Sequence, residues 1–188
     1  MSERKSQILD AAIDYIVQHG MADLSLRPLA EAIGTSARLL IFHFKSKDGL
    51  IAAVLEEIQA RLRVSLMAVP AGVLGQPETS PMKQFWRWAI TPTNLPYLRL
   101  LHEVNAIALQ NPAAFGPALA TASQGWIELI QSRLPSEIRN PVTATLCVAV
   151  FDGLMLELMA TGDALRAEQS LDLFIDMLMH ERQRRMQA

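Results

Sequence analysis

The chain has 188 residues, of which 51% are hydrophobic, and a formal net charge of −2 at pH 7. This length allows one substantial core or a small head on a larger body, and the longest apolar runs are interrupted well before the ~20 residues of a membrane span. The polar N-terminus and the single cysteine, Cys147, favour a soluble cytoplasmic protein without an export signal or an intrachain disulfide.

Charge is unevenly distributed along the chain. Residues 1–47 hold six basic and five acidic side chains, whereas the remainder holds 11 and 14. Four of the basic residues lie between Arg27 and Lys47, and Glu31 is the only acid in that interval. A local basic patch can bind phosphate even when the whole protein is acidic.

Helical periodicity begins at the N-terminus. A first helix is predicted over residues 4–19 and ends at Gly20, since glycine suits the position just past a helix C-terminus. Ser25 is a candidate cap for a short second helix, which Gly34 ends. The apolar stripe of the first helix consists of Ile8, Ala12, Ile13, Ile16 and Val17.

Two further helices complete the first third of the chain. Thr35 or Ser36 can cap a third helix from Ala37 to His43, and Ser46 can cap a fourth. The fourth helix is long enough to link a head to a body. Its predicted buried face consists of Leu50, Ile51, Val54, Leu55, Ile58, Leu62 and Leu66.

The rest of the chain also lacks strand patterns. The interval 70–81 is rich in glycine and proline, which predicts a loop. Further helices are predicted at about 82–90, 95–110, 117–134, 141–160 and 168–185, with Gly162 ending the penultimate one. We therefore expect an all-α protein of about nine helices, in which a three-helix head precedes a helical body.

The segment from Ser25 to Lys47 has the spacing of a helix-turn-helix. Such a unit seats the first residues of its second helix against base edges in the major groove, which requires glycine in the turn and small or polar residues after it. Gly34 and the four residues that follow it meet this requirement. The predicted DNA-contacting residues are Ser25, Arg27, Thr35, Ser36, Ala37, Arg38, Leu39, Phe42, His43 and Lys47.

Individual residues of this segment have more than one interpretation. Arg38 can contact guanine or phosphate, or it can be a solvated surface charge. His43 can contact phosphate, or it can pack against the first helix or cap its own. Spacing alone is also compatible with a three-helix core that binds no DNA.

The stretch from Ile8 to Leu55 resembles the N-terminal domain of the TetR family of bacterial regulators. The resemblance rests on Ile8-Leu-Asp-Ala-Ala12, on the Gly20 and Gly34 turns, and above all on His43-Phe-Lys-Ser-Lys47 followed by Asp48. The family usually has an aromatic pair before the His-Phe, often two tyrosines, where this chain has Ile41 and Phe42, so a phosphate-contacting hydroxyl is missing at Ile41. Phe151-Asp-Gly-Leu-Met155 and Thr161-Gly-Asp163 look like the family's dimerisation helix.

The resemblance implies a DNA-binding domain over 1–47 and a ligand-sensing and dimerisation domain over 48–188. It also implies a homodimer that binds a palindromic operator on double-stranded DNA and is released by a small-molecule effector, that is, a repressor with no cofactor and no bound metal. The same parts would serve an activator. The predicted dimer residues are Val150, Leu154, Leu158, Leu171, Phe174 and Leu178, although some of this apolar surface must be internal core.

Aromatic and methionine side chains of the body are candidates for an effector pocket. Such residues suit an apolar or aromatic ligand, with one or two polar groups to orient it, but the same types at helical spacing also build cores. The candidates are Trp86, Trp88, Tyr97, His102, Glu103, Trp126, Met155 and Met159.

Enzyme motifs are missing from the sequence. There is no glycine-rich nucleotide loop, no nucleophile elbow and no paired-cysteine motif. His102-Glu103 does not begin a zinc-protease motif, because Ala106 stands where the second histidine is needed. We therefore expect a regulator and not an enzyme; the alternative is a helical ligand-binding or scaffold protein without DNA function.

Overall fold

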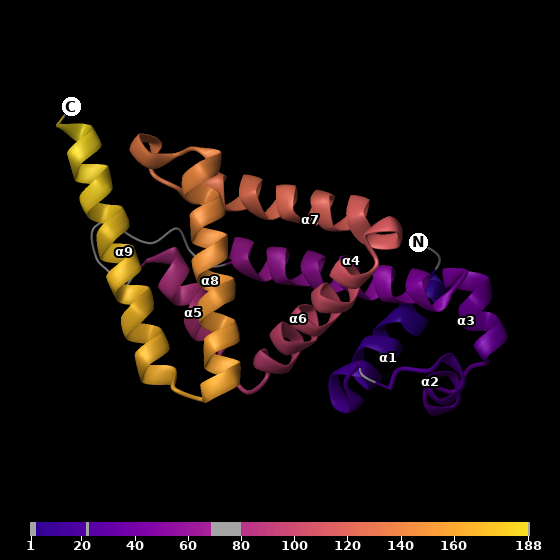
Figure 1. Ribbon diagram of the computed structural model, residues 1–188. Helices are drawn as coiled ribbons and strands as arrows, with labels where there is room; N and C mark the ends of the chain where they lie inside the picture. Colours follow the sequence, from indigo (N-terminus) through magenta and orange to yellow (C-terminus); the bar gives the residue numbers. More distant parts are fainter. Residues whose placement is uncertain (1–2, 22, 69–79, 188) are drawn as a thin grey trace. The chain divides into compact units, whose positions relative to one another are not determined.

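The computed structural model describes residues 3–21, 23–68 and 80–187 (Figure 1). Regular structure in this part of the chain is helical throughout, and no strand occurs in it, so the predicted all-α class is confirmed. The helices are α1 (Glu3–His19), α2 (Leu26–Ala32), α3 (Ala37–Phe44), α4 (Lys47–Ala68), α5 (Pro81–Ala89), α6 (Leu95–Gln110), α7 (Pro112–Arg133), the 3-10 turn η2 (Ser136–Ile138), α8 (Pro141–Thr161) and α9 (Ala164–Met186).

Two helix starts differ from the prediction. Helix α7 begins at Pro112 and not at 117, because the backbone N–H groups of Ala114 and Phe115 bond to Asn111, and Pro117 is accommodated inside the helix. Helix α9 begins at Ala164 and not at 168, because the Asp163 carboxylate accepts the Arg166 N–H at 3.0 Å. Of the predicted loop over 70–81, residues 70–79 lie outside the described residues, and Pro81 begins α5.

The chain divides into two compact units. The first comprises Met1–Leu62 and Pro92–Ala122, and the second Arg63–Thr91 and Ser123–Ala188. Both α4 and α7 therefore contribute to each unit. The predicted domains, 1–47 and 48–188, are a division by function that packing does not test, and they stay a prediction.

The first unit is built on α1 and the first part of α4. The predicted stripe of α1 is buried apart from Val17, which is half-exposed. The predicted face of α4 from Leu50 to Leu62, which lies in this unit, is at most 3% exposed, and Leu66, in the second unit, is buried as well. Full burial of an aliphatic side chain contributes about 1.5–3 kcal/mol. These two faces therefore form a strong anchor for α2 and α3, the short helices that neither length nor propensity would hold alone.

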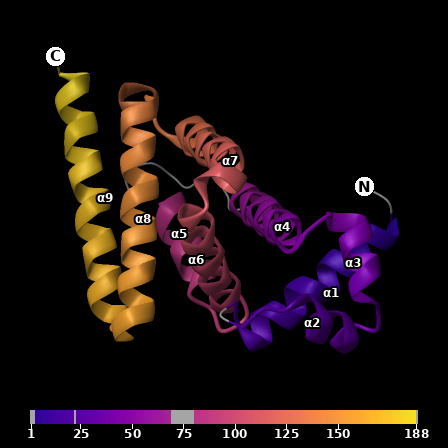
Figure 2. The same ribbon diagram turned by 45° about the vertical axis from the view of Figure 1, so that its right-hand side comes forward.

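The second unit contains the α8–α9 pair, which lies side by side in both views (Figure 2). Gly162, with φ of +73°, ends α8, and the Arg166 guanidinium reaches back to Glu157 at 2.7 Å. Buried Lys83 of α5 joins the pair through Asp172 of α9, at 2.7 Å. At the other end, Arg182 of α9 bonds to Glu137 of η2 at 3.1 Å.

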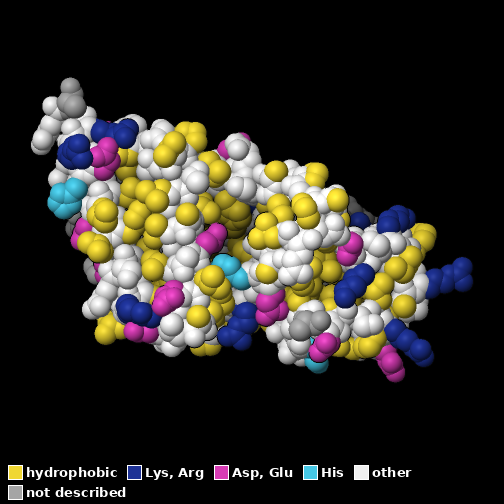
Figure 3. Space-filling view, in the orientation of Figure 1, with side chains coloured by type: hydrophobic (Ala, Val, Ile, Leu, Met, Phe, Trp, Pro, Cys, Tyr) yellow, Lys and Arg dark blue, Asp and Glu magenta, His cyan; other side chains and the backbone are white. Residues whose placement is uncertain are grey.

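Helix α8 is the one described helix that is long and apolar enough to cross a membrane, judged by length and composition alone. It packs on α9 with Ala144, Cys147, Met155 and Leu158 buried, yet most of its surface is not covered within the chain. Apolar side chains gather over it in the space-filling view (Figure 3). A large unpartnered apolar face of this kind on a helix indicates contact with another surface.

Candidate nucleic-acid interface

Helices α2 and α3 are joined by a tight turn that fixes their relation. Gly34 has φ of +68°, in the left-handed region, and the Thr35 N–H donates to the Ala30 carbonyl at 2.8 Å. A side chain at Gly34 would be strained whatever the space around it. The predicted helix-turn-helix spacing is therefore realised as a glycine-closed turn between two short helices.

The start of α3 is stabilised by a side-chain cap. The Ser36 hydroxyl accepts the Leu39 N–H at 3.2 Å, so Ser36, and not Thr35, is the cap. Ser25 precedes α2 but makes no such hydrogen bond. The cap satisfies a backbone donor in the turn of α3 that carries Arg38.

Helix α3 has one buried and one exposed face. Leu40 and Phe44 point into the first unit and are 1% and 5% exposed. Arg38, Ile41 and Phe42 are exposed. The surface that α3 offers to a partner is therefore basic and apolar at once.

The turn between α3 and α4 is unusually close. Lys45 is the one described non-glycine residue with positive φ, at +72°, and the Ser46 hydroxyl accepts the Gly49 N–H at 2.9 Å. A Cβ at Gly49 would lie 1.9 Å from the Phe44 carbonyl oxygen. The sequence reasoning missed Gly49, because nothing in the residue pattern reveals that two helix ends touch.

Nine of the ten predicted DNA-contacting residues lie on α2, on α3 or next to their ends, and the tenth, Lys47, is the first residue of α4. Ser25, Arg27, Ser36, Arg38, Phe42 and Lys47 are exposed, whereas Thr35, Ala37, Leu39 and His43 are half-buried. The His43 ring meets the Phe42 and Phe44 rings edge-on, at 5.1 and 6.3 Å between centroids. Lys and Arg side chains project from this end of the first unit (Figure 3). This end of the first unit therefore has a positively charged surface. Lys47 lies there at a helix N-terminus, a position that favours the binding of phosphate.

The predicted effector-pocket residues are divided between the two units. Tyr97, His102 and Glu103 are half-buried in the first unit, where Glu103 accepts the Met21 N–H at 3.1 Å. Trp86 and Met155 are fully buried in the second. Trp88, Trp126 and Met159 are half-buried there. The Trp86 ring lies edge-on to Phe151 at 5.7 Å, in an aromatic cluster that also includes Phe85.

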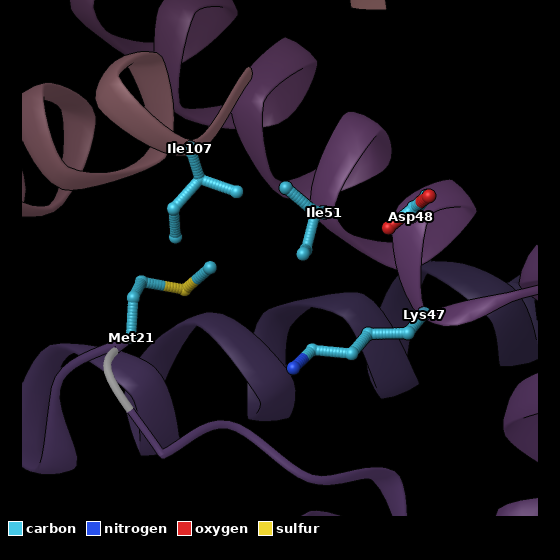
Figure 4. A pocket seen from close by; sticks show the side chains of 5 residues that line it. All are labelled: Met21, Lys47, Asp48, Ile51 and Ile107. Carbon is cyan, nitrogen blue, oxygen red and sulfur yellow. The ribbon is translucent and has the colours of Figure 1, made fainter. Parts of the chain in front are cut away.

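The first unit contains a hollow that the sequence reasoning missed. Its volume is about 340 Å³. Met21, Ile51 and Ile107 converge on it from three segments, and Lys47 and Asp48 line its edge (Figure 4). Sequence separation hides such a meeting of side chains from periodicity arguments. Among the described residues no three His, Cys, Asp or Glu side chains are grouped to hold a metal ion.

None of the six predicted dimer residues is exposed. Leu158 and Leu171 are buried within the chain, and Val150, Leu154, Phe174 and Leu178 are half-buried. The exposed large apolar residues of α8 and α9 are different ones: Val142, Leu146, Leu156, Leu165, Leu173, Met177 and Met186.

Comparison with known proteins gives a consistent result. The family model described as bacterial regulatory proteins, tetR family, matches residues 8–54. The HTH-type transcriptional regulator BetI of Pseudomonas aeruginosa is 25% identical over 194 residues, with 93% of this chain and 91% of that protein aligned.

Two solved structures extend the similarity to the whole fold. A TetR-family member from Streptomyces coelicolor A3 superposes with a TM-score of 0.70 at 28% identity, over 94% of this chain and 98% of that one. The multidrug binding protein EbrR, solved with ethidium, gives a TM-score of 0.70 at 30% identity, over 90% and 96%.

Proposed function

The chain belongs to the TetR family of bacterial transcriptional regulators, and on that premise we propose that it is a cytoplasmic repressor. It binds a palindromic operator as a homodimer and is released by a small apolar or aromatic effector. The exposed face of α3, fixed by the Gly34 turn and the Ser36 cap, is the observation that carries this proposal. A rigid, exposed, basic recognition helix is what major-groove reading requires.

Two kinds of contact to DNA are assigned to the head. Arg38, exposed in the first turn of α3, reads guanine or binds phosphate. Lys47, the first residue of α4, binds phosphate at this helix N-terminus. The half-buried His43, packed between two aromatic rings, orients α3 more than it contacts DNA.

The uncovered face of α8 supports dimer formation. Its exposed residues Val142, Leu146, Ala149, Gly153 and Leu156 alternate in steps of four and three, which is the spacing of a helix seam. Exposed Leu165, Leu173 and Met177 of α9 extend the apolar surface. A second copy of the chain that covers these faces would remove them from water and place two recognition helices on one operator.

The aromatic content of the second unit supports an effector of flat, apolar chemistry. EbrR has been solved with ethidium and with proflavin, which are both aromatic. The buried indole N–H of Trp86 has no acceptor among the described residues, whereas buried indoles usually find one. An effector that carries a hydrogen-bond acceptor could accept the hydrogen bond of the Trp86 indole N–H. We assign the effector to the predicted residues of the second unit, which are Trp86, Trp88, Trp126, Met155 and Met159, with α4 as the helix that carries the change to the head.

The test is binding of the purified protein to duplexes selected from a random library, across a salt series. Wild-type affinity must fall as salt rises, because bound phosphates release counterions. Arg38→Ala is expected to cost about 1–3 kcal/mol, and Lys47→Ala to reduce the salt slope by about one. Arg184→Ala removes an exposed charge from α9, where Arg184 pairs with Glu181, and serves as the control.

A negative result of this binding experiment would support the alternative function. A protein that selects no duplex at any salt concentration is a helical ligand-binding or scaffold protein without DNA function. Sedimentation of the Leu156→Glu variant tests the dimer separately: we expect monomers, whereas Val64→Glu, at an equally exposed residue of α4, leaves the mass unchanged.

A further inference from the structure

The recognition helix exposes an apolar pair. Ile41 is 41% and Phe42 67% exposed, whereas Leu40 and Phe44, on the opposite face of α3, are buried. Exposing the ring of Phe42, in the last turn of α3, forgoes the free energy of its burial. The pair is therefore available to a partner that covers α3.

Basic residues flank this apolar pair on the same side of α3. Arg38, Ile41 and Phe42 follow one another at i, i+3 and i+4, which places them along one face of α3, and Lys45 lies directly after the end of this helix. The Lys45 ammonium donates to the Phe42 carbonyl at 3.0 Å and lies 5.5 Å from the centre of the Phe42 ring. Positive charge is thus held beside the ring, which suits a polyanionic partner.

Neither side chain of the pair can form a hydrogen bond. They cannot satisfy a phosphate oxygen or the donor and acceptor edges of guanine, cytosine and adenine. The major groove displays one apolar group, the C5-methyl of thymine, and apolar side chains contact it.

We propose that Ile41 and Phe42 select thymine in each operator half-site by covering its C5-methyl group. This inference rests on the proposed function, and it names the base chemistry that α3 recognises. Arg38 and Lys45 hold the backbone or a neighbouring base while the apolar pair supplies the discrimination. The operator then has a fixed thymine beside the position that Arg38 contacts.

The test removes single methyl groups from DNA. A duplex selected from a random library is resynthesised with each thymine replaced in turn by deoxyuridine, which differs only by the methyl. One thymine per half-site is expected to show a loss of about fourfold in wild-type affinity, the value of one buried methyl group. Ile41→Ala and Phe42→Ala should bind the thymine duplex more weakly and tolerate the deoxyuridine at that position.

The control variant and the possible outcomes distinguish the thymine inference from the proposed function as a regulator. Leu109→Ala removes a comparably exposed apolar side chain from α6 and must retain the full deoxyuridine effect. Normal duplex binding without any deoxyuridine effect, or an effect that persists in both α3 variants, overturns the thymine inference and leaves the regulator standing. Failure to select any duplex overturns both.

Discussion

Gly49 provides the sharpest test of the head structure. An added Cβ would lie 1.9 Å from the Phe44 carbonyl oxygen and 3.1 Å from its carbonyl carbon, whereas ordinary contact begins at 3.4 Å. Both neighbours are backbone atoms at the end of α3, so no side chain can rotate away. Gly49→Ala must therefore push α3 and α4 apart by about 1.5 Å, the shortfall from that contact distance.

Overpacking of this kind costs about 3 kcal/mol, the upper end of the usual range, because main-chain atoms must move. For a chain of this size that corresponds to a loss of about 6–12 °C in Tm. Thermal unfolding followed by circular dichroism measures it. Displacing α3 should also weaken duplex binding.

The matched control is the same substitution in α7. A Cβ at Gly125 would lie 3.7 Å from the Arg63 guanidinium, at ordinary contact distance from the end of a flexible side chain. Gly125→Ala should therefore stabilise the protein by about 0.5–1 kcal/mol, as expected for a glycine inside a helix. If Gly49→Ala is as stable as wild type, the close α3–α4 turn is wrong.

Three further outcomes follow from the local contacts. Ser36→Ala should lower the free energy of unfolding by about 1 kcal/mol, whereas Ser25→Ala, which removes no cap hydrogen bond, should change it by less than about 0.5 kcal/mol in denaturant titrations. Hydrogen bonds from its own backbone N–H and from Arg182 lower the pKa of Glu137 from 4.5 to about 2. Its contribution to stability is therefore complete above pH 4.5 and lost as the pH falls toward 2, and Glu137→Gln should flatten the stability profile in that window; an unchanged profile refutes this. Burial raises the pKa of the Cys147 thiol to about 11, so a thiol reagent at pH 8 should modify the unfolded chain much faster than the native one.

The sequence predicted the buried face of a helix correctly where charged residues stand between the apolar ones along the chain. In α4 the apolar positions recur every three or four residues with charged residues such as Glu56 between them, and all seven predicted positions are buried. Gly20 and Gly162 ended their helices as expected, because a left-handed residue is needed there. Periodicity and glycine positions are local properties that a single sequence displays.

Helix α8 shows where periodicity loses its information. The helix is apolar nearly all round, so the pattern does not identify which side faces α9. Val150, Leu154 and Leu158 of this helix stay predicted dimer residues, and its most exposed leucines are Leu146 and Leu156. Only the packed partner determines the rotation of such a helix.

The contacts of Gly49 and Glu103 could not be predicted from the sequence for a related reason. The approach of Gly49 to Phe44 depends on the backbone angles of the intervening turn, and Glu103 bonds to Met21, which lies 82 residues away in sequence. Glu103 was predicted as a pocket residue, and this interpretation stays a prediction. Its observed hydrogen bond shows that a polar residue of α6 already has a partner in the head.

These contacts bear on how a signal would reach the recognition helix. Helix α1 is bonded to α6 through the Met21 N–H at its end and Glu103, and to α4 through the ion pair of Asp10 with Arg61. Because both bonds lie within the first unit, a shift of α6 or α4 displaces α1 together with the α2–α3 pair that packs on it, and not α3 alone. If the proposed effector favours one position of these helices, it would thereby favour one position of the whole head. Its influence on DNA affinity is limited to the difference in its own affinity for the two positions.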